Sequence, residues 1–261
     1  MLCDIAINLT DSAFDADRQQ VVAAARAAGV RQLIITGTSV TESQAACTLA
    51  SGQPGLYATA GVHPHYAKDA GADFISELRQ LAAHPAVVAI GECGLDFFRD
   101  LSPRPVQEAV FSAQLALAGE LNMPVLLHER DAAERQCAIV SQYRHRLPGA
   151  VAHCFTGDEA TLRRYLELDL YIGITGWICD ERRGRHLQQL VKLIPDDRLL
   201  LETDAPYLIP RDLKLKSRRN EPRYLPHILA TVARCRGQDS TQLGAMVAAN
   251  SQRLFALAEQ P

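Results

Sequence analysis

The chain has 261 residues, of which 48% are hydrophobic and 22% charged, proportions typical of a globular protein with a sizeable buried core. Its formal net charge of −3 excludes a general attraction for nucleic acid, so any such attraction has to be local. No apolar run approaches the roughly 18 residues of a membrane span, and the N-terminal residues show no secretory signal, so we expect no membrane association.

The seven cysteines are scattered along the chain, and none belongs to a C-x-x-C pair. That spacing argues against a zinc ribbon and against a disulfide framework. We therefore expect free thiols in a reducing environment, and with them a cytoplasmic location.

Short apolar runs, several of them rich in β-branched residues, alternate with amphipathic segments and predict eight strands. In chain order these are residues 3–9, 31–37, 56–61, 86–91, 123–128, 149–154, 170–175 and 198–203. The clearest helical pattern opens at Pro103 and ends before Pro124. Further helices are predicted at residues 17–28, 41–50, 73–83, 158–168, 184–194, 224–235 and 239–256.

Eight strands that alternate with helices predict a parallel sheet, and no linker or low-complexity segment divides the chain. At this length the economical arrangement is a closed (β/α)₈ TIM barrel, which we expect to occupy residues 1–261 as one domain. A doubly wound open sheet is the alternative. It would normally show a glycine-rich turn after the first strand, and the sequence INLTDSAFD has none.

Five of the eight predicted strands end in histidines or acids. These are His63 and His65 after the third strand, Glu92 after the fourth, His128 after the fifth, His153 after the sixth and Asp204 after the eighth. In such barrels the carboxyl ends of the strands meet at one rim. One histidine at a strand end is more often structural, but a set of unpaired acids and imidazoles is costly to desolvate. A divalent cation held by mixed oxygen and nitrogen ligands relieves that cost.

The motifs that carry these residues occur in order along essentially the whole chain: GVHPH, GECGLDF, HER, HCFTG, GITGWICDERRG and LLETDAPYL. Together they resemble the TatD family of metal-dependent deoxyribonucleases, barrel hydrolases related to the amidohydrolases. The resemblance implies metal binding by Glu92, His128, His153 and Asp204, with His63 next to the phosphate that is cleaved. It also implies exonuclease action from the 3′ end on single-stranded DNA and RNA, in DNA repair or degradation.

One position departs from most of the wider family, which has a His-x-His pair at the end of the first strand. This chain has Ala6 and Asn8 there. A site with fewer imidazoles favours Mg²⁺, or Mn²⁺, over Zn²⁺. We expect Asn8 to take part in substrate binding through a hydrogen bond to a metal-bound water. The alternative is that Asn8 is simply a polar residue at the edge of the barrel core.

Residues 211–223, here called the basic loop, hold six basic residues against two acidic ones, a local charge of +4 that leaves −7 for the remainder of the chain. The loop follows the eighth strand, so it lies on the predicted catalytic rim. We expect substrate contacts from its Arg218 and Arg219, and from His65, Arg130, Trp177, Arg182 and Arg183 on the same rim. A solvated charged face is the simpler explanation for such arginines taken alone.

Aromatic residues also lie in the rim segments, namely Phe97, Phe98, Trp177 and Tyr207. Stacking on unpaired bases contributes roughly 1–3 kcal/mol per base and suits a single-stranded substrate. Core packing explains Phe97 and Phe98 equally well.

In the mechanism that these residues suggest, Asp204 binds metal or accepts the proton of the attacking water. His63 donates a hydrogen bond to the phosphate or protonates the leaving oxygen. Glu202, two residues before Asp204, points the same way but deeper, and is expected to support the ligands. Two other functions stay open: a metal-dependent amidohydrolase or deacylase, and a barrel that binds nucleic acid without cutting it. A monomer is the default expectation.

Overall fold

The computed structural model describes residues 1–215 and 217–258. Within them, eight strands form one parallel sheet in which each strand pairs with the next along the chain. The strands are β1 (Leu2–Ile7), β2 (Val30–Ile35), β3 (Leu56–Ala60), β4 (Val87–Asp96), β5 (Val125–Arg130), β6 (Ala150–Ala152), β7 (Tyr171–Ile174) and β8 (Leu199–Leu201). All eight predicted strands are confirmed.

The sheet closes into a barrel where the end of β8 meets β1. The backbone N–H of Asp204 donates to the carbonyl oxygen of Ala6 at 3.0 Å, and that of Asn8 donates to Ala205 at 2.8 Å. These bonds join the segment after β8 to the end of β1. The predicted (β/α)₈ barrel is therefore confirmed, and the sequential strand order excludes a doubly wound sheet.

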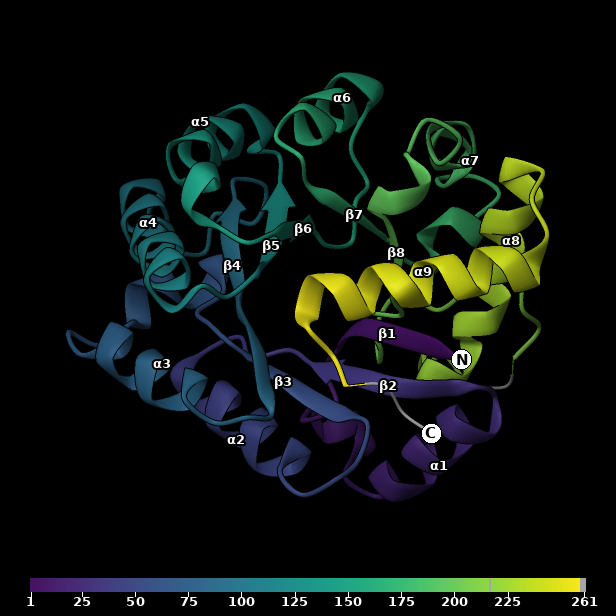
Figure 1. The fold of residues 1–261 in the computed structure, drawn as a ribbon, viewed down its shortest axis with the longest axis horizontal. Helices are drawn as coiled ribbons and strands as arrows, with labels where there is room; N and C mark the ends of the chain where they lie inside the picture. Colours follow the sequence, from purple (N-terminus) through teal and green to yellow (C-terminus); the bar gives the residue numbers. More distant parts are fainter. Residues whose placement is uncertain (216, 259–261) are drawn as a thin grey trace.

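Helices surround the barrel, as Figure 1 shows. They are α1 (Arg18–Ala27), α2 (Val40–Ala50), α3 (Phe74–Ala82), α4 (Arg104–Leu121), α5 (Ala133–Tyr143), α6 (Glu159–Glu167), α7 (Arg185–Leu190), α8 (Leu225–Arg236) and α9 (Ser240–Phe255). The sequence patterns indicated all of these except α5. Its buried side includes Gln136 beside Ile139 and Val140, and a polar residue on that side weakens the apolar periodicity that predicts a helix.

The strand β4 continues past Gly91 to Asp96, so its predicted end was wrong. Two glycines break the apolar pattern that marks the strand, but they do not end it. Glycine is required at both positions, because the φ angles, 131° at Gly91 and 149° at Gly94, are ones that residues with side chains rarely adopt. A Cβ at Gly94 would lie 1.9 Å from the carbonyl oxygen of His128 on β5. The close pairing of these two strands lets β4 carry both Glu92 and Asp96 to the barrel rim.

The buried apolar residues form two clusters. The larger joins the strands to the surrounding helices. The smaller includes Ile5, Leu126 and Leu200 from the strands, together with Leu254 and Phe255 from α9. Figure 1 shows α9, in yellow, crossing one end of the barrel beside β1. That end is packed with apolar side chains, which leaves the opposite end, where the strands finish, for polar chemistry.

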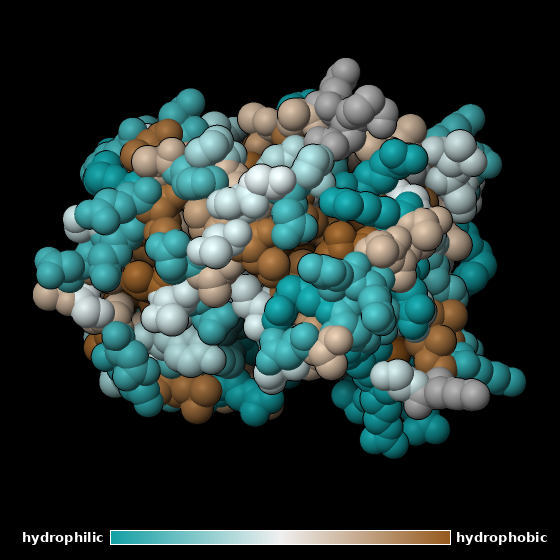
Figure 2. Space-filling model, turned by 90° about the horizontal axis from the view of Figure 1, so that it is seen from below, coloured by the Kyte–Doolittle hydropathy of each residue, from teal (hydrophilic) through white to brown (hydrophobic). Residues whose placement is uncertain are grey.

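The surface carries no obvious apolar face on the side seen in Figure 2, where hydrophilic and apolar residues are interspersed. Among the described residues, the helices are all too short or too polar to cross a membrane.

Candidate active site

The carboxylate of Glu92 lies at the centre of the candidate site. Its Oε1 atom is 2.9 Å from Nδ1 of His128, 3.0 Å from Nε2 of His153 and 3.4 Å from Nε2 of His63. Burial by itself disfavours the charged form, but the imidazoles of His153 and His63 hold the pKa of Glu92 well below its usual range. The strand ends at β3, β4, β5 and β6 therefore meet as predicted.

A second carboxylate of β4, Asp96, faces the same cluster and was missed in the sequence analysis. Its Oδ2 atom lies 2.6 Å from Nε2 of His65 and 3.5 Å from Nε2 of His128. Its other oxygen accepts backbone hydrogen bonds from Phe98 and Arg99. Although burial opposes ionisation, these partners lower the pKa of Asp96. The signal was present in the two-residue spacing of Glu92, Gly94 and Asp96, once β4 is allowed to continue.

The cluster fits a cation. Atom Nε2 of His128 is buried, and within the described residues it has no hydrogen-bond partner. Ligand atoms of His63, Glu92 and His128 all lie within 4.8 Å of one another. Burial works against protonated imidazoles, yet the neighbouring carboxylates raise the pKa of His128 and hold that of His153 well above the usual value. Histidine binds a metal through a deprotonated nitrogen, so a cation bound here would displace any proton on that nitrogen.

Glu202 supports His153 from inside the barrel, as expected. It is completely buried, its Oε2 atom lies 3.1 Å from Nδ1 of His153, and its Oε1 atom accepts the backbone N–H of Cys154. A carboxylate on the far nitrogen of a histidine fixes the ring and raises its basicity, so that the other nitrogen is free for a ligand.

Asp204 follows β8 and is held by Asn8. The Asn8 amide donates to Oδ1 of Asp204 at 3.0 Å, and its own oxygen accepts from the Thr36 hydroxyl at 3.0 Å. Burial raises the pKa of Asp204 to about 7, with smaller contributions from Glu92 and Glu202 in the same direction and opposition from His153. Asn8 thus faces an acid of the candidate site, and its predicted contact with substrate stays a prediction.

His63 lies beside Glu92, and its pKa moves in the opposite direction from those of the other two imidazoles. Burial, with the nearby His128, lowers its pKa to about 4, so the ring is neutral at physiological pH. Its Nδ1 atom accepts the backbone N–H of His65 at 3.1 Å. The proton of the neutral ring is therefore on Nε2, which faces the centre of the cluster.

The predicted basic contacts divide into two groups. Arg130, Arg182, Arg183 and Arg218 are exposed, and no carboxylate in the described residues pairs with them. Arg219 is different, because its terminal N–H groups donate to Asp17, Glu221 and the carbonyl of Ala13. That network favours a role for Arg219 in holding the basic loop. Lys216, part of the loop's predicted charge, lies outside the described residues.

Exposed aromatic rings flank the cluster. Phe98 is 56% exposed, and the Arg130 guanidinium lies 4.4 Å from its ring centre. Tyr207 is 53% exposed, and Tyr66, which was not singled out in the sequence, is 48% exposed. Phe97, in contrast, packs against the core, and Trp177 is half-buried with Arg183 5.5 Å from its ring centre.

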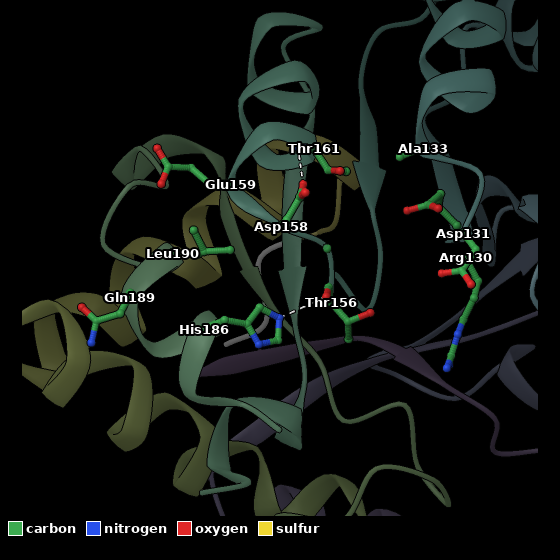
Figure 3. Close-up of a pocket in the computed structure, with 12 residues that line it drawn as sticks. Arg130, Asp131, Ala133, Thr156, Asp158, Glu159, Thr161, His186, Gln189 and Leu190 are labelled. Carbon is green, nitrogen blue, oxygen red and sulfur yellow. Dashed lines mark hydrogen bonds between the residues drawn. The ribbon is translucent and has the colours of Figure 1, made fainter. Parts of the chain in front are cut away.

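A groove of about 800 Å³ lies between the segments that follow β5, β6 and β7, and no residue of the Glu92 cluster is in its lining. Figure 3 shows Arg130 and Asp131 on one wall, and His186 and Gln189 from α7 on the other. Four acids contribute to its lining, namely Glu129, Asp131, Asp158 and Glu159. Phosphate groups would be repelled there, so the groove is a poor path for a nucleic-acid backbone.

A family model described as TatD related DNase matches residues 3–256. The chain belongs to this family. Its relatives include proteins from Klebsiella pneumoniae and Pantoea vagans that are named 3'-5' ssDNA/RNA exonuclease TatD, and each is 55% identical to this chain. The match to the Klebsiella protein covers 97% of both chains. The match to the Pantoea protein covers 98% of this chain and 99% of the relative. Membership confirms the predicted resemblance and the prediction of an enzyme, a metal-dependent hydrolase of the nuclease type.

Solved structures of the TatD family have the same fold. The TatD homologue YJJV from Escherichia coli K12 superposes with a TM-score of 0.91 at 26% identity, over 98% of both chains. An organophosphorus hydrolase from Deinococcus radiodurans, at 17% identity and a TM-score of 0.63 over 97% of this chain and 91% of its own, shares the fold alone.

Proposed function

We propose that this TatD-family chain hydrolyses phosphodiester bonds of single-stranded DNA and RNA, removing nucleotides from the 3′ end in the presence of Mg²⁺. The observation that carries the proposal is the contact of Glu92 with three imidazoles at 2.9, 3.0 and 3.4 Å. Support comes from relatives whose names describe that activity.

The ligands we propose are Glu92, His128, His153 and Asp204. When bound, a divalent cation neutralises charge on the phosphoryl oxygens and lowers the pKa of a water. Because the end of β1 supplies an amide, Asn8, and no imidazole, we propose Mg²⁺, with Mn²⁺ as a substitute and Zn²⁺ less suited.

Two residues would move or hold protons. His63 is neutral with its proton on Nε2, so we assign it a hydrogen bond to a phosphoryl oxygen in the transition state, where negative charge increases. Asp204, held by Asn8 through Oδ1, is the carboxylate that we assign to accept the proton of the attacking water.

The rim suits unpaired bases. Tyr66, Phe98 and Tyr207 expose rings on which bases can stack, and stacking contributes roughly 1–3 kcal/mol per base. A duplex hides those base faces, so the rings favour single strands. The unpaired Arg182, Arg183 and Arg218 would contact phosphates.

The proposal extends to the state of the protein. We propose one domain over residues 1–261, acting as a monomer in the cytoplasm. The described cysteines are all unpaired, which suits a reducing compartment.

The test uses metal-stripped protein and an oligonucleotide labelled at its 5′ end, in single- and double-stranded form, with Mg²⁺, Mn²⁺ or Zn²⁺ added back. We expect a Mg²⁺-dependent ladder that shortens from the 3′ end of the single strand. His128→Ala should abolish it. His186→Ala is the matched control, since this histidine lies on the same rim but outside the Glu92 cluster, bonded to Thr156.

Two results would count against the proposal. Binding of the strand without cleavage under any metal would favour the non-catalytic barrel. Hydrolysis of an acyl or amide bond with intact oligonucleotide would favour the deacylase or amidohydrolase.

A further inference from the structure

A second group of metal-type ligands lies away from the Glu92 cluster. It consists of Cys179, Asp212 and His227, whose ligand atoms all lie within 4.8 Å of one another. They come from three separate segments: the short 3₁₀ helix Gly176–Cys179 after β7, the basic loop and α8. The established family activity and the proposed mechanism use none of them.

The contacts within this group bring an ion pair and a thiol together. Nε2 of His227 faces both oxygens of Asp212, at 2.9 Å each. Two tetrahedral ligands of one zinc ion, each about 2.0–2.1 Å from it, lie roughly 3.3 Å apart, a little farther than this pair. The third member, the Cys179 thiol, is buried and donates a hydrogen bond to the Thr231 hydroxyl at 3.6 Å. An ion pair has no need of a thiol at its side.

The surroundings hold the ligands at the same place. Arg211, the neighbour of Asp212, lies 3.4 Å from the carboxylate of Asp180, the neighbour of Cys179. This ion pair joins the loop to the segment after β7 right beside Asp212 and Cys179. His227 is fixed to α8, one turn before Thr231. Sulfur, nitrogen and oxygen ligands in one site are a set that Zn²⁺ accepts and Mg²⁺ does not.

We propose that Cys179, Asp212 and His227 form a second metal site that binds Zn²⁺ and fastens the basic loop to α8, independently of the nuclease centre. Binding replaces the S–H bond of Cys179 by a sulfur–zinc bond, and the proton goes to solvent. The metal would hold the loop that carries Arg218 on the catalytic rim.

Zinc content is the first test. The full chain, its Cys179→Ser and His227→Gln variants, and Cys47→Ser are loaded with Zn²⁺ in the presence of Mg²⁺ and passed through a desalting column. Cys47 is the matched control, because it is a buried thiol on α2 outside the group. We expect the wild type and Cys47→Ser to retain one more zinc ion per chain than the other two variants. Equal zinc content in all four proteins would overturn the site.

Cobalt gives a second readout that the nuclease centre does not share. Co²⁺ bound by a thiolate produces a charge-transfer absorption, which imidazole and carboxylate ligands do not give. The absorption is expected in the wild type and in Cys154→Ser, which removes the thiol next to His153, and it is expected to disappear in Cys179→Ser. Its absence from the wild type, or its loss only in Cys154→Ser, would contradict the proposal. If Cys179→Ser folds poorly, the partly exposed His227→Gln still decides through zinc content.

The attachment of the loop is tested separately by trypsin. Zn²⁺ should slow cleavage after Lys214 and Arg218 in the wild type by several-fold, and it should leave the rate in His227→Gln unchanged. Equal protection of both proteins would show that the loop is held in another way. Neither result depends on whether the chain cuts nucleic acid.

Discussion

Asn8 and Asp204 show how one amide can set the chemistry of an acid. Asn8 donates to Oδ1 of Asp204, and that bond lowers a pKa that burial has raised to about 7. As a proposed ligand, Asp204 has to lose its proton before it binds metal. The affinity for Mn²⁺ should therefore increase with pH, by up to about tenfold per unit for each displaced proton, and Asp204 contributes its share of that increase below pH 7.

In Asn8→Ala the donated bond is lost, so the pKa of Asp204 rises and the pH dependence of Mn²⁺ binding should move to higher pH. We expect several-fold weaker binding than wild type at pH 7 and nearly equal binding at pH 9. Calorimetric titrations of metal-free protein from pH 6 to pH 9 measure this. Superimposable curves for the two proteins would show that Asn8 does not act through Asp204.

Asp96 should matter as much as the residues that the motifs indicated. It is 2.6 Å from Nε2 of His65, and replacing a carboxylate that holds a site histidine typically costs 10–100-fold in metal affinity or activity. We expect Asp96→Asn to lower the Mg²⁺-dependent cleavage rate by roughly that factor. Asp100→Asn, at an exposed acid of the same segment that pairs with Arg104, should retain the wild-type rate.

At the scale of elements, the geometry of the site depends on how closely β4 passes β5. Gly94 pairs with His128 across the two strands, and a Cβ there would lie 1.9 Å from the His128 carbonyl oxygen. Its φ of 149° adds strain for any other residue. The close approach of the two backbones at His128 thus depends on a residue that has no side chain.

Gly94→Ala should therefore push β5 away from β4. We expect a loss of about 1–3 kcal/mol in the free energy of unfolding, typical of strain at such a position, and at least a tenfold lower cleavage rate. Gly71→Ala is the control, because nothing lies within 4 Å of a Cβ there. Thermal denaturation and the oligonucleotide assay test both effects, and a Gly94→Ala protein that matched Gly71→Ala would refute the argument.

For the whole molecule, closure of the barrel uses a buried acid, Asp4 of β1. Its carboxylate accepts the backbone N–H of Thr203, after β8, at 2.8 Å and contacts the Thr203 hydroxyl at 2.5 Å. Burial raises the pKa of Asp4 to about 8, against the hydrogen bonds from Thr203. The folded chain thus keeps a proton that the unfolded chain releases near pH 4.

The stability that this proton gives is present at low pH and is lost as pH rises towards 8, at up to roughly 1.4 kcal/mol per pH unit. Asp4→Asn keeps an acceptor but cannot ionise. We therefore expect the difference in unfolding free energy between the variant and the metal-free wild type to shift in favour of the variant as the pH rises from 5 to 9. Urea denaturation measures this difference. Asp73→Asn, at an exposed acid before α3, should show no such change, and a constant difference for Asp4→Asn would contradict the prediction.

By itself, the sequence determined the strands, their order and, apart from Asp96 on β4, the site residues at their carboxyl ends. Each strand is a local apolar run, and parallel strands of a barrel bring their ends to one rim. This is why Glu92, His128 and His153 could be predicted to meet before any distance was known.

The tertiary structure decided what depends on contacts between distant segments. Only the pairing of β4 with β5 shows that the strand reaches Asp96, and only the neighbours of Arg219 show that its donors hold the loop. The meeting of Cys179 with His227 has no sequence pattern at all. Local periodicity records which side of an element is buried, but not which partner a side chain finds there.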